Sequence, residues 1–205
     1  MVKNNISVVV FDLGKVLIPF DYKKSIDKLE LIEKDLGKKF YEFYQNNYQT
    51  HRKFERGDLP EEEFISIMLN ALEHKVSKEI FIQYYSDIFT LNENVASLLP
   101  LLKKNYTLCL LSNTDSLHHK YGWYKYDFLK YFDKLFLSYQ VGAVKPEEKI
   151  YRAVEEFTKK PSSEHIFIDD IPEYAEAARR FGWNAIQFQN YDQLVKALEE
   201  NNIVL

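Results

Sequence analysis

Residues 8–14 read VVVFDLG, and this stretch indicates the fold class. The apolar run begins at Ile6, is rich in β-branched residues and is nearly continuous, which is typical of a strand buried on both faces of a parallel sheet. It ends at Asp12, and Gly14 permits a tight turn just beyond. We therefore predict a buried strand over residues 6–11 with a carboxylate at its carboxyl end.

The next zone, residues 22–89, has apolar residues at helical spacing and no convincing strand. Gly37 and Gly57 follow two of the periodic stretches and suit helix ends, Pro60 suits a first helical turn, and Ser77 suits an N-cap. We predict a small bundle of four amphipathic helices: residues 26–36, residues 38–54, one after Pro60 and one from Ser77.

From residue 91 to the end, helical and strand patterns alternate. Alternation of this kind predicts an α/β protein with a parallel sheet and helices on both faces. The first strand belongs to that sheet, so we predict a core of residues 1–18 and 91–205 with a helical insertion, residues 19–90. Further strands are expected at residues 106–111, 134–138, 165–168 and 184–188, and helices at 94–103, 147–157, 173–181 and 192–201.

The composition narrows the class of protein. The 205 residues are 46% hydrophobic and 28% charged, as in soluble globular proteins, and apolar runs fall far short of the ~18–20 residues that span a bilayer. A net charge of −4 argues against nucleic acid as the main ligand. The start of the chain does not resemble a secretory signal, and a single cysteine, Cys109, fits a reducing compartment. We therefore expect a cytoplasmic protein with no membrane or nucleic-acid partner, and its oligomeric state stays open.

Polar residues follow four of the predicted strands. Asp12 follows the first, residues 112–115 (Ser-Asn-Thr-Asp) follow the second, Lys145 comes after the third, and residues 169–170 (Asp-Asp) follow the fourth. Ligands of open α/β sheets bind at the carboxyl ends of the strands, so these side chains should converge.

The residue types predict the chemistry of that edge. Close carboxylates need a cation, and Mg²⁺ prefers carboxylate oxygens with waters. Ser112 and Lys145 can hold an anion such as phosphate, and a carboxylate beside them can attack phosphorus. Taken singly, each residue could serve as a turn or helix cap, but capping explains all four strand ends much less well.

Together these residues resemble the four motifs of the haloacid dehalogenase superfamily of hydrolases. The resemblance covers almost the whole chain, and it implies a Rossmann-like core with a helical cap inserted after strand one. The motifs correspond to residues 8–17, 110–114, 141–147 with Ile150-Tyr151, and 167–173 with Ala177-Ala178 and Phe181-Gly182.

The resemblance implies a Mg²⁺ site. Asp12 would be both the nucleophile and a metal ligand, and Asp170 would be the second carboxylate ligand. Gly14 would offer its backbone carbonyl to the metal, and Asp169 would position a metal-bound water.

The resemblance also implies a phosphoryl site. Ser112 and Lys145 would bind the transferring phosphoryl group, with support from Asn113. The implied protein is a Mg²⁺-dependent phosphatase that acts through an aspartyl-phosphate on Asp12. Its expected substrate is a small phosphorylated metabolite, with a sugar phosphate as the leading candidate.

The sequence departs from the family pattern after the nucleophile. Most phosphatases of this superfamily carry a second Asp two residues on, as general acid and base; here that position is Gly14, and Val16 replaces a common Thr. General acid catalysis contributes ~10²–10⁴-fold, so its loss would slow turnover without abolishing it. His118 and Lys15 are candidate proton donors, although His118 could equally lie on a solvated helix.

A narrower resemblance points to the branch that holds α-glucose-1-phosphate phosphatases and the N-terminal phosphatase domain of epoxide hydrolases. Residues 112–114 with 117–118, and residues 55–57, resemble the former, and residues 169–171 resemble the latter.

The insertion offers candidate substrate contacts. Arg56 could reach from the insertion to the substrate or pair with Glu55 or Asp58. The tyrosines of residues 41–48 could line a sugar pocket or simply pack.

Two other functions stay open. One is a non-catalytic or regulatory protein that binds a phosphorylated ligand on the same scaffold, because the usual general acid is missing. The other is a 2-haloacid dehalogenase, in which Asp12 would attack carbon. Those enzymes also lack the second Asp but work without metal, whereas Asp169-Asp170 resembles a metal site.

Overall fold

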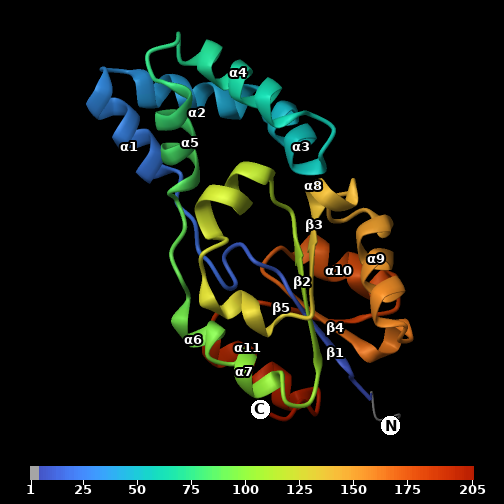
Figure 1. Ribbon diagram of the computed structural model, residues 1–205. Helices are drawn as coiled ribbons and strands as arrows, with labels where there is room; N and C mark the ends of the chain where they lie inside the picture. The colour runs from blue at the N-terminus through green and yellow to red at the C-terminus, as the bar shows by residue number, and fades with distance from the viewer. Residues whose placement is uncertain (1–4) are drawn as a thin grey trace.

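A computed structural model describes residues 5–205 of the chain. Its centre is a five-stranded sheet in the order β3-β2-β1-β4-β5, with every neighbouring pair parallel (Figure 1). The predicted α/β fold is confirmed, and each strand lies within two residues of its predicted bounds. The strands are β1 (Val8–Phe11), β2 (Thr107–Ser112), β3 (Lys134–Leu137), β4 (His165–Asp169) and β5 (Asn184–Gln187).

The central strand β1 is buried on both faces, as its sequence predicts. Val9 and Phe11 face one apolar layer, and Val8 and Val10 face the other. Each fully buried aliphatic or aromatic side chain contributes roughly 1.5–3 kcal/mol, which holds β1 at the centre of the sheet. Cys109 on β2 is also buried and free, as expected of a small core residue.

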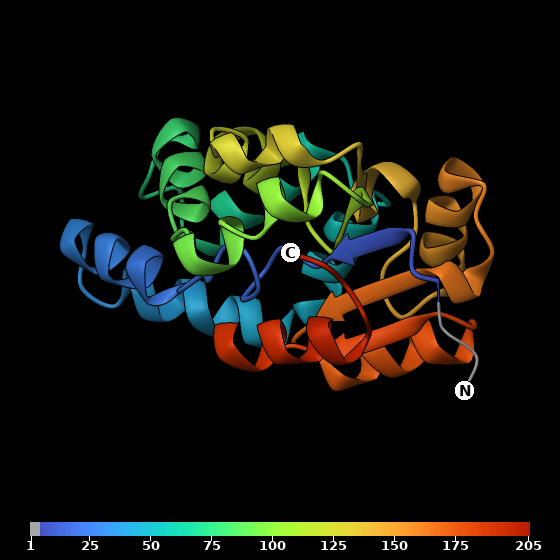
Figure 2. The same ribbon diagram turned by 90° about the horizontal axis from the view of Figure 1, so that it is seen from below.

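Helices cover both sides of the sheet, which is plain in the view from below (Figure 2). The helix expected over residues 94–103 is two four-residue helices, because the chain turns at Ser97 and Leu98. The helices of the core are α6 (Glu93–Ala96), α7 (Leu99–Leu102), α8 (Ser138–Val141), α9 (Glu148–Thr158), α10 (Pro172–Arg180) and α11 (Tyr191–Glu200).

The helical segment of residues 19–90, inserted between β1 and α6, lies over the carboxyl ends of the strands (Figure 1). It holds five helices, so the prediction of four is wrong. The helix expected over residues 38–54 breaks at Asn47, whose side-chain amide and backbone N–H both donate to the carbonyl of Phe43. The five are α1 (Lys23–Ile32), α2 (Leu36–Asn46), α3 (Tyr48–Arg56), α4 (Glu61–Ala71) and α5 (Lys78–Ser86).

Gly37 does not end a helix, so the prediction of a helix end at this glycine is wrong. It lies in the first turn of α2, and a Cβ there would come within 2.3 Å of the carbonyl oxygen of Ile26 on α1. The glycine is therefore needed where two helices cross closely.

The two connections to the core run side by side. Phe20 and Phe89 form an antiparallel bridge, and Thr90 donates its N–H to the carbonyl of Pro19 at 2.8 Å. The domain limits at residues 18 and 91 stay a prediction. Among the residues that the structure describes, no helix is both long and apolar enough to cross a bilayer.

Candidate active site

The structure brings together the polar residues at the strand ends. Asp12 follows β1, while Ser112 and Asp169 end the flanking strands β2 and β4. Lys145, between α8 and α9, reaches the same point, and its Nζ donates to Asp12 Oδ1 at 2.7 Å and to Asp169 Oδ2 at 2.6 Å. These side chains are almost completely buried.

Asp12, Asp169 and Asp170 form a carboxylate cluster whose oxygens lie within 4.8 Å of one another. Burial raises the pKa of Asp12 to about 7, against the opposing effect of Lys145. Burial and the charge of Asp169 also raise the pKa of Asp170. Lys145, with Lys15 acting on Asp170, leaves the three carboxylates under-neutralised, so the site favours a cation, and an all-oxygen ligand set suits Mg²⁺.

The three carboxylates are not equivalent. Asp169 accepts from Lys145 through Oδ2 and from the N–H of Ile171 through Oδ1 at 2.8 Å, so both of its oxygens are engaged. Asp12 has only one oxygen committed to Lys145, and Asp170 is partly exposed. Asp12 and Asp170 are therefore better placed to hold a metal, and Asp169 is better placed to orient the ammonium of Lys145.

Asn113 fixes the backbone of Lys145. Its Oδ1 accepts from the N–H of Lys145 at 2.7 Å, and its Nδ2 donates to the carbonyl of Lys145 at 3.2 Å. The same carbonyl accepts from Nη2 of Arg52 at 2.6 Å. Burial would lower the pKa of Lys145, but Asp12 and Asp169 outweigh it and raise that pKa, so the ammonium stays charged.

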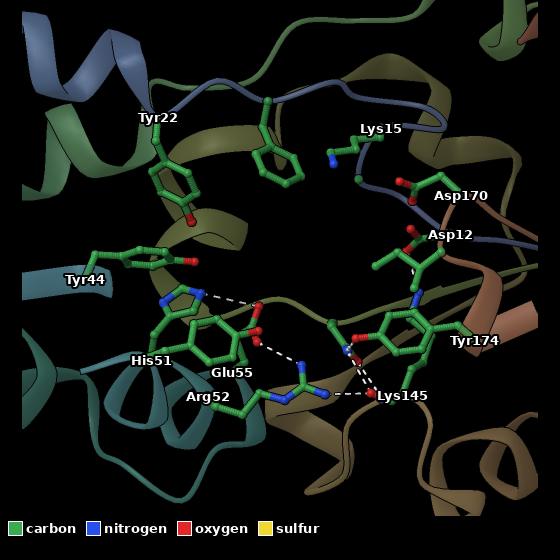
Figure 3. A pocket seen from close by; sticks show the side chains of 15 residues that line it. Asp12, Lys15, Tyr22, Tyr44, His51, Arg52, Glu55, Lys145, Asp170 and Tyr174 are labelled. Atoms are coloured by element: carbon green, nitrogen blue, oxygen red, sulfur yellow. Dashed lines mark hydrogen bonds and ion pairs between the residues drawn. The ribbon is translucent and has the colours of Figure 1, made fainter. Parts of the chain in front are cut away.

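A cavity of about 190 Å³ separates the carboxylate cluster from the helical segment (Figure 3). A second cavity of about 70 Å³ adjoins it, with Gly14, Phe20, Tyr22, Glu55 and Asn113 common to both. The Ser112 hydroxyl lies on the smaller one, with only a 3.4 Å contact to a neighbouring carbonyl. The helical segment lines the larger cavity with Tyr22, Tyr44, Tyr48, His51, Arg52 and Glu55.

A buried ion pair lies in this wall. His51 Nε2 is 3.4 Å from Glu55 Oε1, and Nη1 of Arg52 is 3.2 Å from Glu55 Oε2. Burial works against both charges. Even so, Glu55 raises the pKa of His51, while His51 and Arg52 lower the pKa of Glu55. The pair therefore favours the charged form of each group.

The comparison with protein families decides the classification. A model of haloacid dehalogenase-like hydrolases matches residues 6–182. The chain belongs to the haloacid dehalogenase-like hydrolase family. The resemblance inferred from the four motifs is thereby confirmed, and the chain is a hydrolase by family.

Individual relatives agree with this family. D-ribitol-5-phosphate phosphatase of Bacteroides thetaiotaomicron is 26% identical over 204 residues, which cover 93% of this chain and 93% of the relative. A wild-type family enzyme of the same bacterium, solved in complex with magnesium and inorganic phosphate, has a TM-score of 0.76 at 25% identity, covering 92% of this chain and 98% of that one. Bifunctional epoxide hydrolase 2 of Mus musculus is 30% identical over 110 residues, 50% of this chain and 19% of the relative.

Arg56 forms an ion pair with Asp58, one of the two roles that its sequence left open. It also pairs with Glu147, and it does not line the larger cavity. Arg52, one helical turn earlier on α3, does. The sequence signal for this wall was present in the spacing of Tyr44, Tyr48, Arg52 and Glu55, but the insertion gave no motif to mark that face as functional.

His118 is buried rather than solvated. Its Nδ1 lies 2.9 Å from Asp115 and its Nε2 lies 3.2 Å from the carbonyl of Tyr85, whose ring stacks on it at 4.2 Å. His118 borders the smaller cavity, with both ring nitrogens engaged. Lys15, the other donor candidate, lines the larger cavity.

The position of the missing family Asp is filled by an aromatic ring. A Cβ on Gly14 would lie 3.1 Å from Cε1 of Phe20. The backbone carbonyl of Gly14 accepts from Val16 at 2.7 Å and retains a second lone pair. Gly14 has no side chain that can donate a proton, and the ammonium on this side is Lys15 Nζ, 5.8 Å from the centre of the Phe20 ring.

Proposed function

We propose that the chain is a Mg²⁺-dependent phosphatase that hydrolyses a small phosphorylated metabolite, a sugar or alditol phosphate, through an aspartyl-phosphate on Asp12. The observation that carries the proposal is the buried contact of Lys145 with Asp12 and Asp169, beside Asp170, at the floor of a cavity. A cytoplasmic location fits the single buried Cys109.

The metal would be held by Asp12, Asp170 and the carbonyl of Gly14, with Asp169 behind them. When bound, Mg²⁺ would neutralise the phosphoryl oxygens and the cluster. The oxygen-only donor set fits this ion, and the relative solved with magnesium and phosphate supports the assignment.

The chain's own residues would perform two displacements. The Asp12 carboxylate attacks phosphorus, a new P–O bond forms, and the bond to the leaving oxygen breaks. The leaving oxygen takes a proton from solvent water, and the water that attacks in the second step gives one back. Lys145 and Ser112 donate to the phosphoryl oxygens as charge redistributes. Water then attacks the aspartyl-phosphate, which releases inorganic phosphate and restores Asp12.

The cavity limits substrate size. Its volume of about 190 Å³, with the adjoining 70 Å³, is below the roughly 300–1,000 Å³ of most ligand pockets, which favours a small substrate. The relative named for D-ribitol 5-phosphate supports a short polyhydroxylated chain as the leaving group.

Phosphate release tests the proposal. Activity on p-nitrophenyl phosphate and sugar phosphates should need Mg²⁺, vanish with EDTA and vanish in Asp12→Asn. Asp127→Asn, an exposed carboxylate with 96% of its side chain accessible, is the matched control and should stay active. Equal rates with and without chelator would refute the proposal.

The non-catalytic alternative has one observation in its favour, which is that Phe20 occupies the space beside Gly14. It predicts that calorimetry detects binding of phosphorylated ligands while none is hydrolysed. A dehalogenase would instead release halide from 2-chloropropionate without metal.

A further inference from the structure

The wall of the larger cavity that faces the carboxylate cluster is polar. In Figure 3 the hydroxyls of Tyr22 and Tyr44 point into the cavity, and the carboxylate of Glu55 lies across from Asp12 and Asp170. The wall comes from the helical segment and the cluster from the core, so a ligand between them touches both.

Glu55 is a buried acceptor with unused capacity. Its side chain is 14% exposed, and it borders both cavities. Its contacts of 3.4 Å to His51 and 3.2 Å to Arg52 are at or beyond the long end of hydrogen-bond distances. A carboxylate can accept about four hydrogen bonds, so the oxygens of Glu55 can accept further donors from the cavity.

The charges around Glu55 select the kind of donor. Two cations, His51 and Arg52, already flank the carboxylate and hold its pKa low, so a third cation gains little there. Neutral hydroxyl donors are the better match.

Arg52 already serves two acceptors with two of its five N–H donors. Its Nη1 faces Glu55 and its Nη2 donates to the carbonyl of Lys145 at 2.6 Å. A second phosphate or a carboxylate on the substrate would have to bind Arg52 close to the Glu55 carboxylate, whose negative charge repels it.

The two tyrosines complement Glu55. Burial raises the pKa of both Tyr22 and Tyr44, so their hydroxyls stay protonated, and their rings lie 5.2 Å apart. A phenol both donates and accepts, as does each hydroxyl of a polyol.

We infer that Glu55, Tyr22 and Tyr44 form a recognition site for hydroxyl groups, and that the substrate is the monophosphate of a neutral polyol or small sugar without an amine or a second anion. The inference rests on the proposed phosphatase function, and it adds the residues that recognise the hydroxyl groups and the exclusion of an amine or a second anion.

Matched substrates test it. D-ribitol 5-phosphate and n-pentyl phosphate share a five-carbon chain, but only the first carries hydroxyl groups on it. O-phosphoethanolamine carries an amine, and fructose 1,6-bisphosphate carries a second phosphate. The wild type should prefer ribitol 5-phosphate in kcat/KM. Glu55→Gln should lower kcat/KM for ribitol 5-phosphate by about 10- to 100-fold, and Tyr22→Phe by about 3- to 10-fold, while pentyl phosphate changes less than about threefold.

Glu42→Gln, an exposed carboxylate on α2 paired with Lys38, is the control and should change neither substrate. Equal losses on both substrates, no loss on ribitol 5-phosphate, or a preference for O-phosphoethanolamine or the bisphosphate would overturn the inference. Tyr22→Phe removes one hydroxyl and serves as the test if Glu55→Gln does not fold. Failure of the phosphatase proposal looks different, since then no compound is hydrolysed with Mg²⁺, p-nitrophenyl phosphate included.

Discussion

Replacing Lys145 with methionine in the metal-free protein should destabilise the fold strongly. Lys145 is 1% exposed and makes contacts of 2.7 and 2.6 Å with Asp12 and Asp169, whose side chains are 9% and 0% exposed. Removing the ammonium leaves two buried carboxylates without their cation, and breaking such a pair costs about 3–5 kcal/mol. For a chain of this size that lowers Tm by roughly 6–20 °C.

A double-mutant cycle isolates the cause. Thermal unfolding in EDTA would be followed for Lys145→Met, Asp12→Asn and the double variant. Asp12→Asn should restore part of the lost stability in the Lys145→Met background, because it removes one of the unpaired charges. Lys196→Met, on a side chain that is 78% exposed, is the control for loss of a lysine. A Tm drop below about 2 °C for Lys145→Met, or strictly additive losses, would refute the reasoning.

Three further predictions concern the helical segment. Arg52→Gln should lower kcat/KM about tenfold or more, because Arg52 lines the cavity and donates to the carbonyl of Lys145. Arg56→Gln should change kcat/KM less than about twofold. The reverse order would contradict the placement of these arginines. Gly37→Ala should lower the free energy of unfolding by about 1–3 kcal/mol, because the added Cβ meets a backbone oxygen of α1. Thermal unfolding measures this loss, and an unchanged Tm would contradict the close crossing of the two helices. Burial opposes the charge of His51 but Glu55 raises its pKa, so the stabilisation by this ion pair is complete below about pH 6.5 and is lost as the pH rises through the raised value. In urea unfolding, the free energy of unfolding should therefore fall less toward pH 8 in His51→Gln than in the wild type. An equal fall would argue against the pair.

The core was predictable because its signals are local. A parallel strand buried on both faces reads as a continuous apolar run, and β1 and β4 do so. Polar residues that interrupt such runs mark the strand ends, and parallel topology then brings those ends together. The convergence of Asp12, Lys145 and Asp169 followed from sequence order and this rule alone.

The helical segment was harder to predict because its signals depend on tertiary contacts. Gly37 has the sequence appearance of a helix end, yet its role is the crossing of α1 and α2. Whether Arg52 or Arg56 enters the cavity depends on which face of α3 turns inward, and that face depends on how the helix packs in the folded protein. Likewise, Gly14 reads as a missing acid, and only the structure shows Phe20 in that space.

Helix α3 links recognition to catalysis through the contacts of one element. Its residues Glu55 and Arg52 line the cavity, and Arg52 also donates to the carbonyl of Lys145. The backbone carbonyl of Glu55 accepts from Ser138 Oγ at 2.6 Å, at the end of β3. The hydrogen bonds that hold α3 at the cavity wall therefore also hold the segment that carries Lys145. A substrate that displaced Arg52 would disturb that lysine, so binding of the wrong ligand and loss of the catalytic geometry should occur together.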